Sequence, residues 1–420
     1  MSGILNIFDI GKVSLDVAQR SLAVVSHNIS NVNTPGYSKQ EAIVSDRTPL
    51  DGAPGQIGRG AQVTSIRRSV NEQLEGRLTE STEKLGQYDV YHSALQEIES
   101  LFPDAQGEGL GKAISEFFTA AHDVANAPSD LTPRSVLLAR GNALASRFND
   151  TVTRLDDHRQ GLDKQITQTL TKINDLADQI AELNGKIVDA ENRGQQANDL
   201  RDTRQRALND VATRIEVSTV EDSEGNLNVF VGKGQALVLS TTSFDLSGAA
   251  NSSNNGFVDV EIATGGSSTL PIGSALTSGE LKGLLDARDT TIPDLNDSLD
   301  RLAAAIVNEV NQVQTAGYDL DQEVGSVFFD ALSVSSSAGS ANTGSLTITG
   351  TISTASSLTY HDYTLTFGSA GAYTIVDATT GTSAAAGTYT GPGPTTLTAF
   401  DGLTMTFAGS TPTSGDTYTL

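Results

Sequence analysis

The chain has 420 residues, of which 51 are acidic and 27 are basic, so its formal net charge is −24. A charge of this sign and size argues against nucleic acid and anionic membrane surfaces as partners. Cysteine is absent, which excludes disulfides and thiolate metal sites.

The N-terminal residues have neither the basic region nor the continuous apolar run of a cleaved signal peptide. No stretch of the sequence approaches the roughly 20 apolar residues that a membrane-spanning helix needs. We therefore expect no membrane insertion, and an exported chain would have to use a route without a cleaved leader.

The first segment has apolar or small residues spaced alternately four and three apart: Ile4, Phe8, Gly11, Leu15, Ala18, Leu22, Val25 and Ile29. This spacing predicts a helix with the seam of a coiled coil. Ile7, Val17 and Val24 widen the apolar surface, so we expect partner helices to cover it on more than one side. Packing of this helix against its own domain is the alternative.

The helix is expected to end within SHNISNVNTPGYSKQ, residues 26–40. This stretch combines helix terminators and turn residues, followed by an aromatic anchor: Asn28, Asn31, Asn33, Pro35, Gly36 and Tyr37. Asparagine tolerates left-handed backbone and bonds locally to the chain, and a proline excludes the preceding residue from a helix. A Pro-Gly pair suits the centre of a type II turn with positive φ at the glycine. The sequence predicts a joint of defined shape.

Residues 41–66 contain several turn signals and the strand-like run AQVTSI, so an extended or loop-like segment is expected. Gly55, Gly58 and Gly60 precede this run instead of a helix, and no Gly-Lys-Ser/Thr occurs. A phosphate-binding loop is therefore not expected.

Helices are expected to dominate from 68 to 215. The first is VNEQLEGRLTESTEKLGQYDVYHSALQEIESLF, the second GLGKAISEFFTAAHDVANAP, and the third begins near Pro133 and extends towards residue 190. The third has an apolar stripe spaced mainly four and three apart: Ile166, Leu170, Ile173, Ala177, Ile180, Leu183, Ile187 and Ala190. A shorter helix, NDLRDTRQRALNDVATRI, carries acid-before-base pairs such as Asp202 and Arg206, which predict a solvated face with ion pairs.

The apolar period changes to two after residue 215, with a hairpin expected to turn at Glu224-Gly225-Asn226. A helix with one apolar stripe returns at 292–316. No lysine or arginine follows Arg301, and the short alternating runs after residue 331 predict an antiparallel sandwich or barrel rich in Thr and Ser. The predicted fold class is therefore α+β and multidomain: an N-terminal coiled-coil helix and joint (1–40), a helical-bundle domain (41–215, completed by 290–330), a β insertion (216–289) and a β domain (331–420).

Candidate chemistry is sparse. The five histidines show no metal-ligand spacing, and no hydrolase or metalloprotease motif occurs. Four acidic residues occupy positions 1, 3, 5 and 12 of an EF-hand loop: Asp319, Asp321, Glu323 and Asp330. The sixth position requires glycine but is Val324, so an acidic turn is expected instead of a calcium site. We predict a non-enzymatic protein without catalytic, cofactor or metal sites, and a hydrogen-bonded structural role for His27.

The heptad helix followed by SHNISNVNTPGYSKQ resembles the N-terminal signature of bacterial flagellar rod, hook and hook-associated proteins. Four later segments are similar, in the same order, to the hook-associated protein 1 family of hook–filament junction proteins: GLGKAISEFFTAAHDVANAP, IAELNGKIVDAENRGQQANDLRDTRQRAL, GELKGLLDARDTTIP and VNQVQTAGYDL. The resemblance covers nearly all of residues 1–330 and is looser from 331 to 420.

The resemblance implies a structural subunit that self-assembles into the junction ring between hook and filament. It implies export through the flagellar type III channel to the cell exterior. The implied partners are further copies in a homo-oligomer ring, the hook protein, a second hook-associated protein or the filament, and an export chaperone; no cofactor is implied. The family's assembly helix is matched here by Ile4, Phe8, Leu15, Leu22, Val25 and Ile29. Its joint is matched by Asn28, Asn31, Asn33, Pro35, Gly36 and Tyr37.

The family ends in a second amphipathic helix that pairs with the first, and this sequence shows none, so we expect a truncated chain whose first helix lacks that partner. A hook or rod protein is an alternative, although such long helical regions argue against it because hook proteins are mostly β after their first helix. A secreted adhesin that uses the Thr/Ser-rich β domain belongs to a different class. So does a cell-wall hydrolase, for which we find no constellation of carboxylates or histidines.

Overall fold

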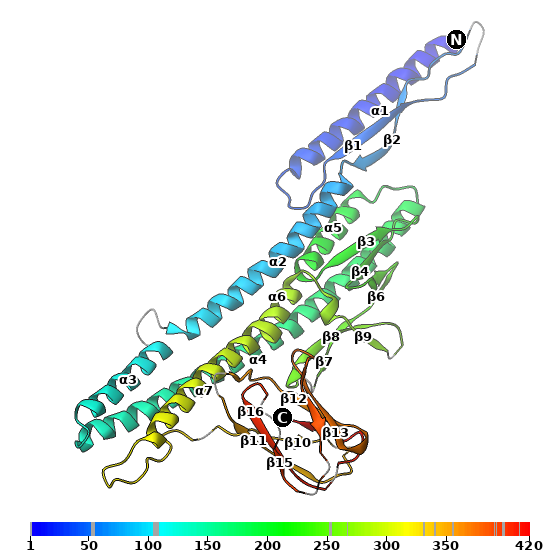
Figure 1. The fold of residues 1–420 in the computed structure, drawn as a ribbon. Helices are drawn as coiled ribbons and strands as arrows, with labels where there is room; N and C mark the ends of the chain where they lie inside the picture. Colours follow the sequence, from blue (N-terminus) through cyan, green and yellow to red (C-terminus); the bar gives the residue numbers. More distant parts are fainter. Residues whose placement is uncertain are drawn as a thin grey trace. The chain divides into compact units, whose positions relative to one another are not determined.

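The computed structural model describes residues 2–51, 55–103, 109–251, 254–266, 268–330, 332–339, 342–354, 357–389, 391, 393–396, 400–410 and 412–420, without the side chains of 2–5. The chain divides into two compact units. The first contains Met1–Ser100 and Asp156–Thr291, and the second contains Leu101–Leu155 and Ile292–Leu420. The α+β class is confirmed (Figure 1). The predicted domain limits stay predictions.

The first unit begins with an arm, by which we mean α1 (Ser2–Ser30), β1 (Gln40–Asp46) and β2 (Ala61–Arg68). The two strands pair antiparallel, with Gln40 opposite Arg68, and both contact α1 (Figure 1). The AQVTSI run is therefore a strand, as its sequence predicts.

The hairpin of β1 and β2 covers part of the apolar surface of α1. One side of α1 carries Ile10, Val13, Val17 and Val24, which are half-buried or buried. Because β1 and β2 pack on α1, this part of the surface is covered within the chain. The expectation that partner helices cover Val17 and Val24 is wrong, since the helical period alone did not reveal the hairpin.

Four helices of the first unit follow: α2 (Glu72–Leu101, up to Ser100), α4 (Leu131–Asn192, from Asp156), α5 (Asn198–Arg214) and α6 (Glu280–Asp286). A π-helical turn, Ala287–Thr291, continues α6. The predicted stripe of α4 forms the core, and five of its residues are fully buried: Ile166, Ile173, Ala177, Ile180 and Ile187.

The β insertion consists of two antiparallel sheets. One has the order β3 (Val217–Glu221), β4 (Leu227–Val231), β5 (Gln235–Leu239) and β6 (Thr242–Ser243). The other has the order β7 (Leu246–Ala250), β8 (Val258–Ala263) and β9 (Thr269–Pro271). The predicted hairpin is confirmed, because β3 and β4 pair around residues 222–226 and alternate residues of β4 are buried.

Two asparagines of α4 attach these sheets to the helix. The Asn184 amide donates to the Leu227 carbonyl and accepts from the Leu227 N–H, at 3.0 Å each. Asn174 makes the same pair of bonds with Leu246. Since Asn184 is fully buried, its amide groups need these partners to offset their desolvation.

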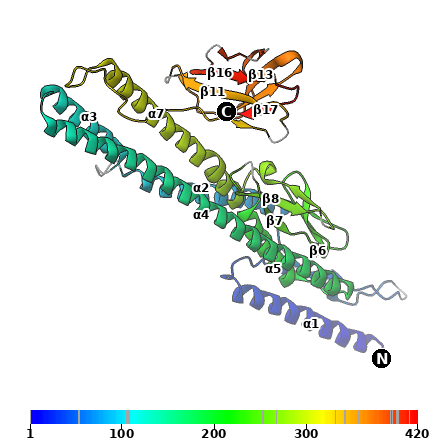
Figure 2. The same cartoon turned by 90° about the horizontal axis from the view of Figure 1, so that it is seen from below.

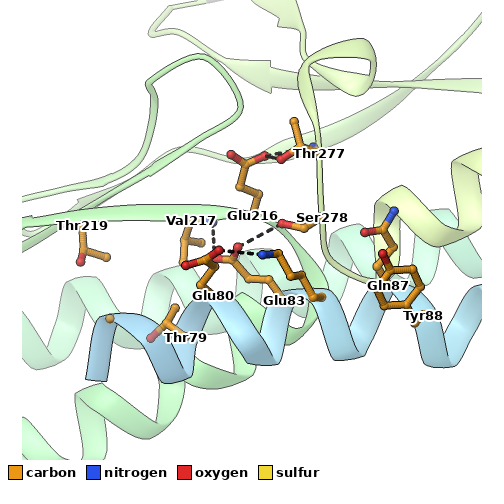
Figure 3. A pocket seen from close by; sticks show the side chains of 12 residues that line it. Thr79, Glu80, Glu83, Gln87, Tyr88, Glu216, Val217, Thr219, Thr277 and Ser278 are labelled. Atoms are coloured by element: carbon orange, nitrogen blue, oxygen red, sulfur yellow. Dashed lines mark hydrogen bonds and ion pairs between the residues drawn. The ribbon is translucent and has the colours of Figure 1, made fainter. Parts of the chain in front are cut away.

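Helix α2 packs on the unit through small and polar residues rather than leucines. The buried Glu83 side chain accepts hydrogen bonds from the Val217 N–H and the Ser278 hydroxyl, both at 3.0 Å (Figure 3). Gly86 lies so close to the Thr213 carbonyl that an added Cβ would overlap it. The glycine therefore sets how closely α2 approaches the end of α5.

We expect Gly86→Ala to destabilise the protein by about 1–3 kcal/mol, because the new methyl group must displace the backbone around Thr213. Gly76→Ala in the same helix is the matched control, since a Cβ there meets nothing within 4 Å. The control is expected to gain about 0.5–1 kcal/mol, because alanine loses less backbone entropy than glycine in a helix. Urea unfolding of both variants measures the difference, and equal shifts in both would contradict the close packing of Gly86.

Burial raises the pKa of Glu83 above its ordinary value, against the opposing effect of the bonds from Val217 and Ser278. The folded state therefore binds this proton more tightly than the unfolded state. The stabilising contribution is fully present below the unfolded pKa, about 4.3, and is lost as pH rises through the folded pKa.

We expect Glu83→Gln to remove this contribution to the pH dependence, because the amide oxygen can still accept from the Val217 N–H and the amide NH2 can donate to the Ser278 hydroxyl oxygen, without a charge. Relative to the native chain, the variant should gain stability as the pH rises from acidic to neutral. Thermal unfolding of both proteins across that range is the measurement. A stability difference that stays constant with pH would be the contrary result.

The second unit contains α3 (Leu110–Asn126), the first part of α4 and α7 (Ile292–Ala316). The helix predicted at 292–316 is confirmed. Its stripe is buried at Ile292, Leu299 and Ile306, whereas Val313 is 73% exposed. The rings of Phe328 and Phe329 each lie 5.7 Å from that of buried Phe117 and so anchor the segment after α7.

The β domain of this unit has two antiparallel sheets. The larger has the order β10 (Ser337–Ala338), β17 (Thr417–Thr419), β12 (Tyr363–Phe367), β13 (Ala372–Asp377) and β14 (Ser383–Thr388). The smaller has the order β11 (Leu346–Ile352), β16 (Leu403–Gly409) and β15 (Thr395–Thr396). Alternate residues of β12 and β16 fill one core, including Leu365, Phe367, Met405 and Phe407. This bears out the predicted antiparallel β region (Figure 2).

Candidate assembly site

Helix α1 leaves a long apolar stripe in solvent. Phe8, Leu15, Leu22 and Ile29 are spaced seven residues apart and are 72%, 70%, 68% and 68% exposed. Val25 adds to this stripe at 51% exposure, and the side chain of Ile4 lies outside the described residues. At 1.5 Å per residue, the stripe extends over about 30 Å. Exposed apolar surface of this length is typical of a helix that packs against another helix.

The stripe is separate from the surface that the hairpin covers. With about 100° between successive residues, Leu15 and Leu22 point to a different side of α1 from Val17 and Val24. The third side carries polar groups, including an Asp16–Arg20 ion pair of 2.9 Å. The helix thus has three sides. One packs on its own hairpin, one is polar and exposed, and one is apolar and exposed.

The joint begins where α1 ends at Ser30. The Tyr37 N–H bonds to the Thr34 carbonyl at 3.2 Å, and φ is 72° at Gly36. This is the type II turn that the Pro35-Gly36 pair predicts. Of the two properties expected of the asparagines, the left-handed backbone is not used, since Gly36 has positive φ but Asn28, Asn31 and Asn33 do not, whereas Asn28 and Asn31 do bond locally to the chain.

Asn28 joins the end of α1 to the start of β1. Its amide nitrogen donates to the Gln40 carbonyl, and its oxygen accepts from the Gln40 N–H, at 2.8 Å each. The Tyr37 hydroxyl also donates to that oxygen, at 2.7 Å. Asn31 instead bonds back to the His27 carbonyl, and Asn33 lies exposed in the turn. The structure thus brings Asn28 and Tyr37 together at one point.

His27 completes this group, with its Nδ1 3.0 Å from the Tyr37 hydroxyl. Because Asn28 Oδ1 can only accept, the Tyr37 proton points to it, and His27 Nδ1 must carry the proton of the His27–Tyr37 bond. Burial, followed by the carboxylates of Asp199 and Asp202, raises the pKa of Tyr37, which keeps its hydroxyl a donor. The hydrogen bond agrees with the structural role predicted for His27.

The N-terminal half of α5 contacts the joint, which the sequence did not reveal. Asp202 accepts from the Ser38 N–H at 3.0 Å and, through its other oxygen, from Arg68 at 2.7 Å. Asp199 accepts from the Gln40 amide at 2.8 Å, and Asn198 donates to the Ile66 carbonyl at 2.7 Å. These bonds hold both the loop after α1 and the end of β2.

The prediction that Asp202 and Arg206 form a solvated ion pair is wrong. Asp202 is 4% exposed and pairs with Arg68, which is 134 residues away in sequence. The Arg206 side chain donates to Thr203, and its aliphatic part lies against Gly36. In the sequence, the feature that comes nearest to indicating these contacts is the run of polar residues at the start of the helix. Such a run does not show whether the polar face is solvated or hydrogen-bonded to another part of the chain.

Sites for small ligands are less developed. Among the described residues, no group of three or more His, Cys, Asp or Glu side chains could hold a metal ion. In the acidic run after α7, Asp319 accepts from the Asp321 and Glu323 N–H groups and so forms a tight turn. A cavity of about 560 Å³ beside Glu83 is lined mainly by α2 and β3 (Figure 3).

No helix in the described part of the chain is long and apolar enough to span a membrane.

Comparison with known proteins adds independent information. The family model for the flagellar hook-associated protein FlgK helical domain matches residues 95–329, and that for the flagella basal body rod protein matches residues 15–37. Flagellar hook-associated protein 1 of Escherichia coli (strain K12) is 26% identical over 414 residues, which cover 97% of this chain and 74% of the relative. The protein of the same name from Salmonella typhimurium (strain LT2) is 28% identical over 322 residues, covering 75% and 57%.

A solved structure is similar as well. The flagellar hook junction protein FlgK from Burkholderia pseudomallei matches with a TM-score of 0.65 and 27% identity, covering 82% of this chain and 62% of that one. The chain thus spans 57% to 74% of the length of these relatives. Since the helical-domain model alone matches more than half of the residues, this protein belongs to the flagellar hook-associated protein FlgK family, whose members are structural components of the flagellum.

Proposed function

We propose that this protein is a non-enzymatic subunit of the junction between the flagellar hook and filament, and that it assembles through α1. The observation that carries the proposal is the exposed stripe of α1, in which four large apolar residues keep a spacing of seven over the helix. The hairpin packs on another side of α1, so it does not bury this stripe.

The names of the similar proteins support the location. The Burkholderia structure is described as a hook junction protein, and the two curated relatives are described as hook-associated. The rod-protein match covers only residues 15–37, so it indicates a short N-terminal segment that is also similar to rod proteins. The match over residues 95–329 favours a junction protein over a hook or rod protein.

The proposal includes the partners that follow from this location. Further copies of the chain would form a ring, with the hook protein on one side and a second hook-associated protein or the filament on the other. The subunit would work outside the cell, after export with the help of a chaperone. The charge of −24 favours subunits that stay apart until specific faces meet.

Antibody labelling tests the location directly. Gold-labelled antibodies raised against this chain, applied to flagella of the bacterium that carries the sequence, should mark the boundary between hook and filament in electron micrographs. Cells that lack the gene should carry hooks without filaments. Label along the whole hook or filament, or normal filaments without the gene, would refute the proposal.

A further inference from the structure

In the described part of the chain, a short stretch between β2 and α2 joins the arm to the rest of its unit. Helix α1 lies at the N-terminal end, β2 ends at Arg68 and α2 begins at Glu72. Within the described residues, the covalent connection between the arm and the remainder of the unit therefore runs through residues 69–71. Each of these residues has two soft backbone dihedrals, so the covalent link by itself does not fix the direction of the arm.

Apolar packing does not fix the direction either. Among the described residues of the arm, Val24 is the one hydrophobic side chain that is buried, and Gln40 is the one polar residue that is buried. The non-directional hydrophobic effect therefore contributes little between the arm and its surroundings. Directional hydrogen bonds must supply the orientation.

Those bonds come from Asn198, Asp199 and Asp202 on one side of α5, where the aliphatic part of Arg206 also lies against Gly36; we call these four residues the lock face. The spacing of three and four residues places the first three on adjacent turns of the helix. Asp202 bonds to Ser38 with one oxygen and to Arg68 with the other. It thus ties the start and the end of the hairpin region to the same carboxylate.

The lock face makes further hydrogen bonds to the arm besides those of Asp202. Asp199 holds Gln40, the residue that Asn28 also holds, so α5 is connected through Gln40 to the end of α1. Asn198 bonds to the backbone of β2 at Ile66. The Arg68–Asp202 pair is shielded, with side-chain exposures of 13% and 6%. A shielded pair that loses one partner leaves the other charge unpaired, so partial release is disfavoured.

From these contacts we infer that the lock face is the device that sets the direction of α1, and that releasing it lets the arm pivot about residues 69–71. Asp202 is the principal positioning residue, and Asp199 and Asn198 restrict rotation about it. The use of α1 in assembly rests on the proposed function, but the lock itself depends only on contacts within this unit. The lock determines where the apolar stripe of α1 is presented.

Distance measurements between spin labels test the lock. The chain has no cysteine, so Ser14→Cys on α1 and Lys186→Cys on α4 give two unique labelling sites, both exposed. In the full chain, double electron–electron resonance should show one narrow distance distribution. Asp202→Ala should broaden it at least twofold, while circular dichroism shows unchanged helix content.

Two further variants make the result decisive. Asp210→Ala on the exposed part of α5 is the matched control and should leave the distribution narrow. Combining Arg68→Gln with Gln40→Ala removes, from the arm side, the bond of Arg68 to Asp202 and that of Gln40 to Asp199, so it gives the answer even if Asp202→Ala does not fold. A distribution as narrow as that of the parent in the arm-side variant would overturn the inference, whatever antibody labelling shows about the location of the protein.

Discussion

Replacing Leu15 and Leu22 together by aspartate is expected to abolish assembly while the isolated chain stays folded. Both side chains are about 70% exposed, at 70% and 68%, so the change removes little packing within the chain. At an exposed helical position aspartate costs about 0.5–0.7 kcal/mol relative to good helix formers. In an interface, each leucine would contribute about 1.5–3 kcal/mol by burial, and an unpaired carboxylate there would add a larger penalty.

Thermal unfolding of the purified chain and electron microscopy of cells that carry the double variant are the two measurements. Arg20→Gln combined with Ala23→Asp is the matched control, because it makes the same change in net charge on the exposed polar side of α1, away from the stripe. The control cells should keep their filaments, and the Leu15/Leu22 cells should lose them. Filaments on both, or on neither, would show that the stripe is not the assembly surface.

Replacing Arg288 by methionine is expected to destabilise the first unit by about 3–5 kcal/mol, because two carboxylates lose a buried partner. The guanidinium is fully buried and forms a two-point contact with Asp289, at 2.8 and 2.7 Å. It also donates to Asp163 and to the Val258 carbonyl. The π-helical turn that carries Arg288 is thereby attached both to α4 and to β8.

Urea unfolding measures this loss. Lys282→Met, one turn and a half earlier, is the control because it removes the same charge from a partly exposed pair with Asp286. An exposed pair of this kind contributes about 0–1 kcal/mol. If Arg288→Met proves no less stable than Lys282→Met, the buried network does not hold the β insertion on the helices.

The strongly periodic elements of the fold could be predicted from the sequence. The α4 stripe, the α7 helix and the alternation in β4 each depend on neighbours within a few residues, and all three are confirmed. The family resemblance is confirmed as well, because it depended on segments spread along residues 1–330 in a fixed order.

The remaining features depend on contacts between distant parts of the chain. The hairpin that covers one side of α1 has no helical period, so its position could not be inferred from α1. Asp202 meets Arg68 across 134 residues, and Arg288 meets Asp163 across 125. A charged residue in a helix has the same local pattern whether it is solvated or buried in such a pair. Tertiary partners decide between the two, and single-sequence patterns do not contain them.

The assembly role of the joint residues stays a prediction, although their geometry is now defined. Asn28 and Tyr37 meet at one point, Gly36 supplies the turn, and Asn31 bonds within the end of α1. These residues connect the exposed stripe to the lock face on α5. The joint is therefore a hydrogen-bonded structure that fixes α1 to the rest of its unit, in addition to ending the helix.

Cysteine cross-linking in intact flagella tests the central claim most directly. Because the chain has no cysteine, Leu22→Cys introduces one unique thiol in the stripe, and Arg20→Cys introduces one on the polar side of α1 as a control. A subunit that assembles through the stripe should form cross-linked species at position 22 in assembled flagella, and not at position 20 or in the isolated chain. A thiol at position 22 that stays unlinked and fully reactive towards a water-soluble maleimide in assembled flagella would contradict the account.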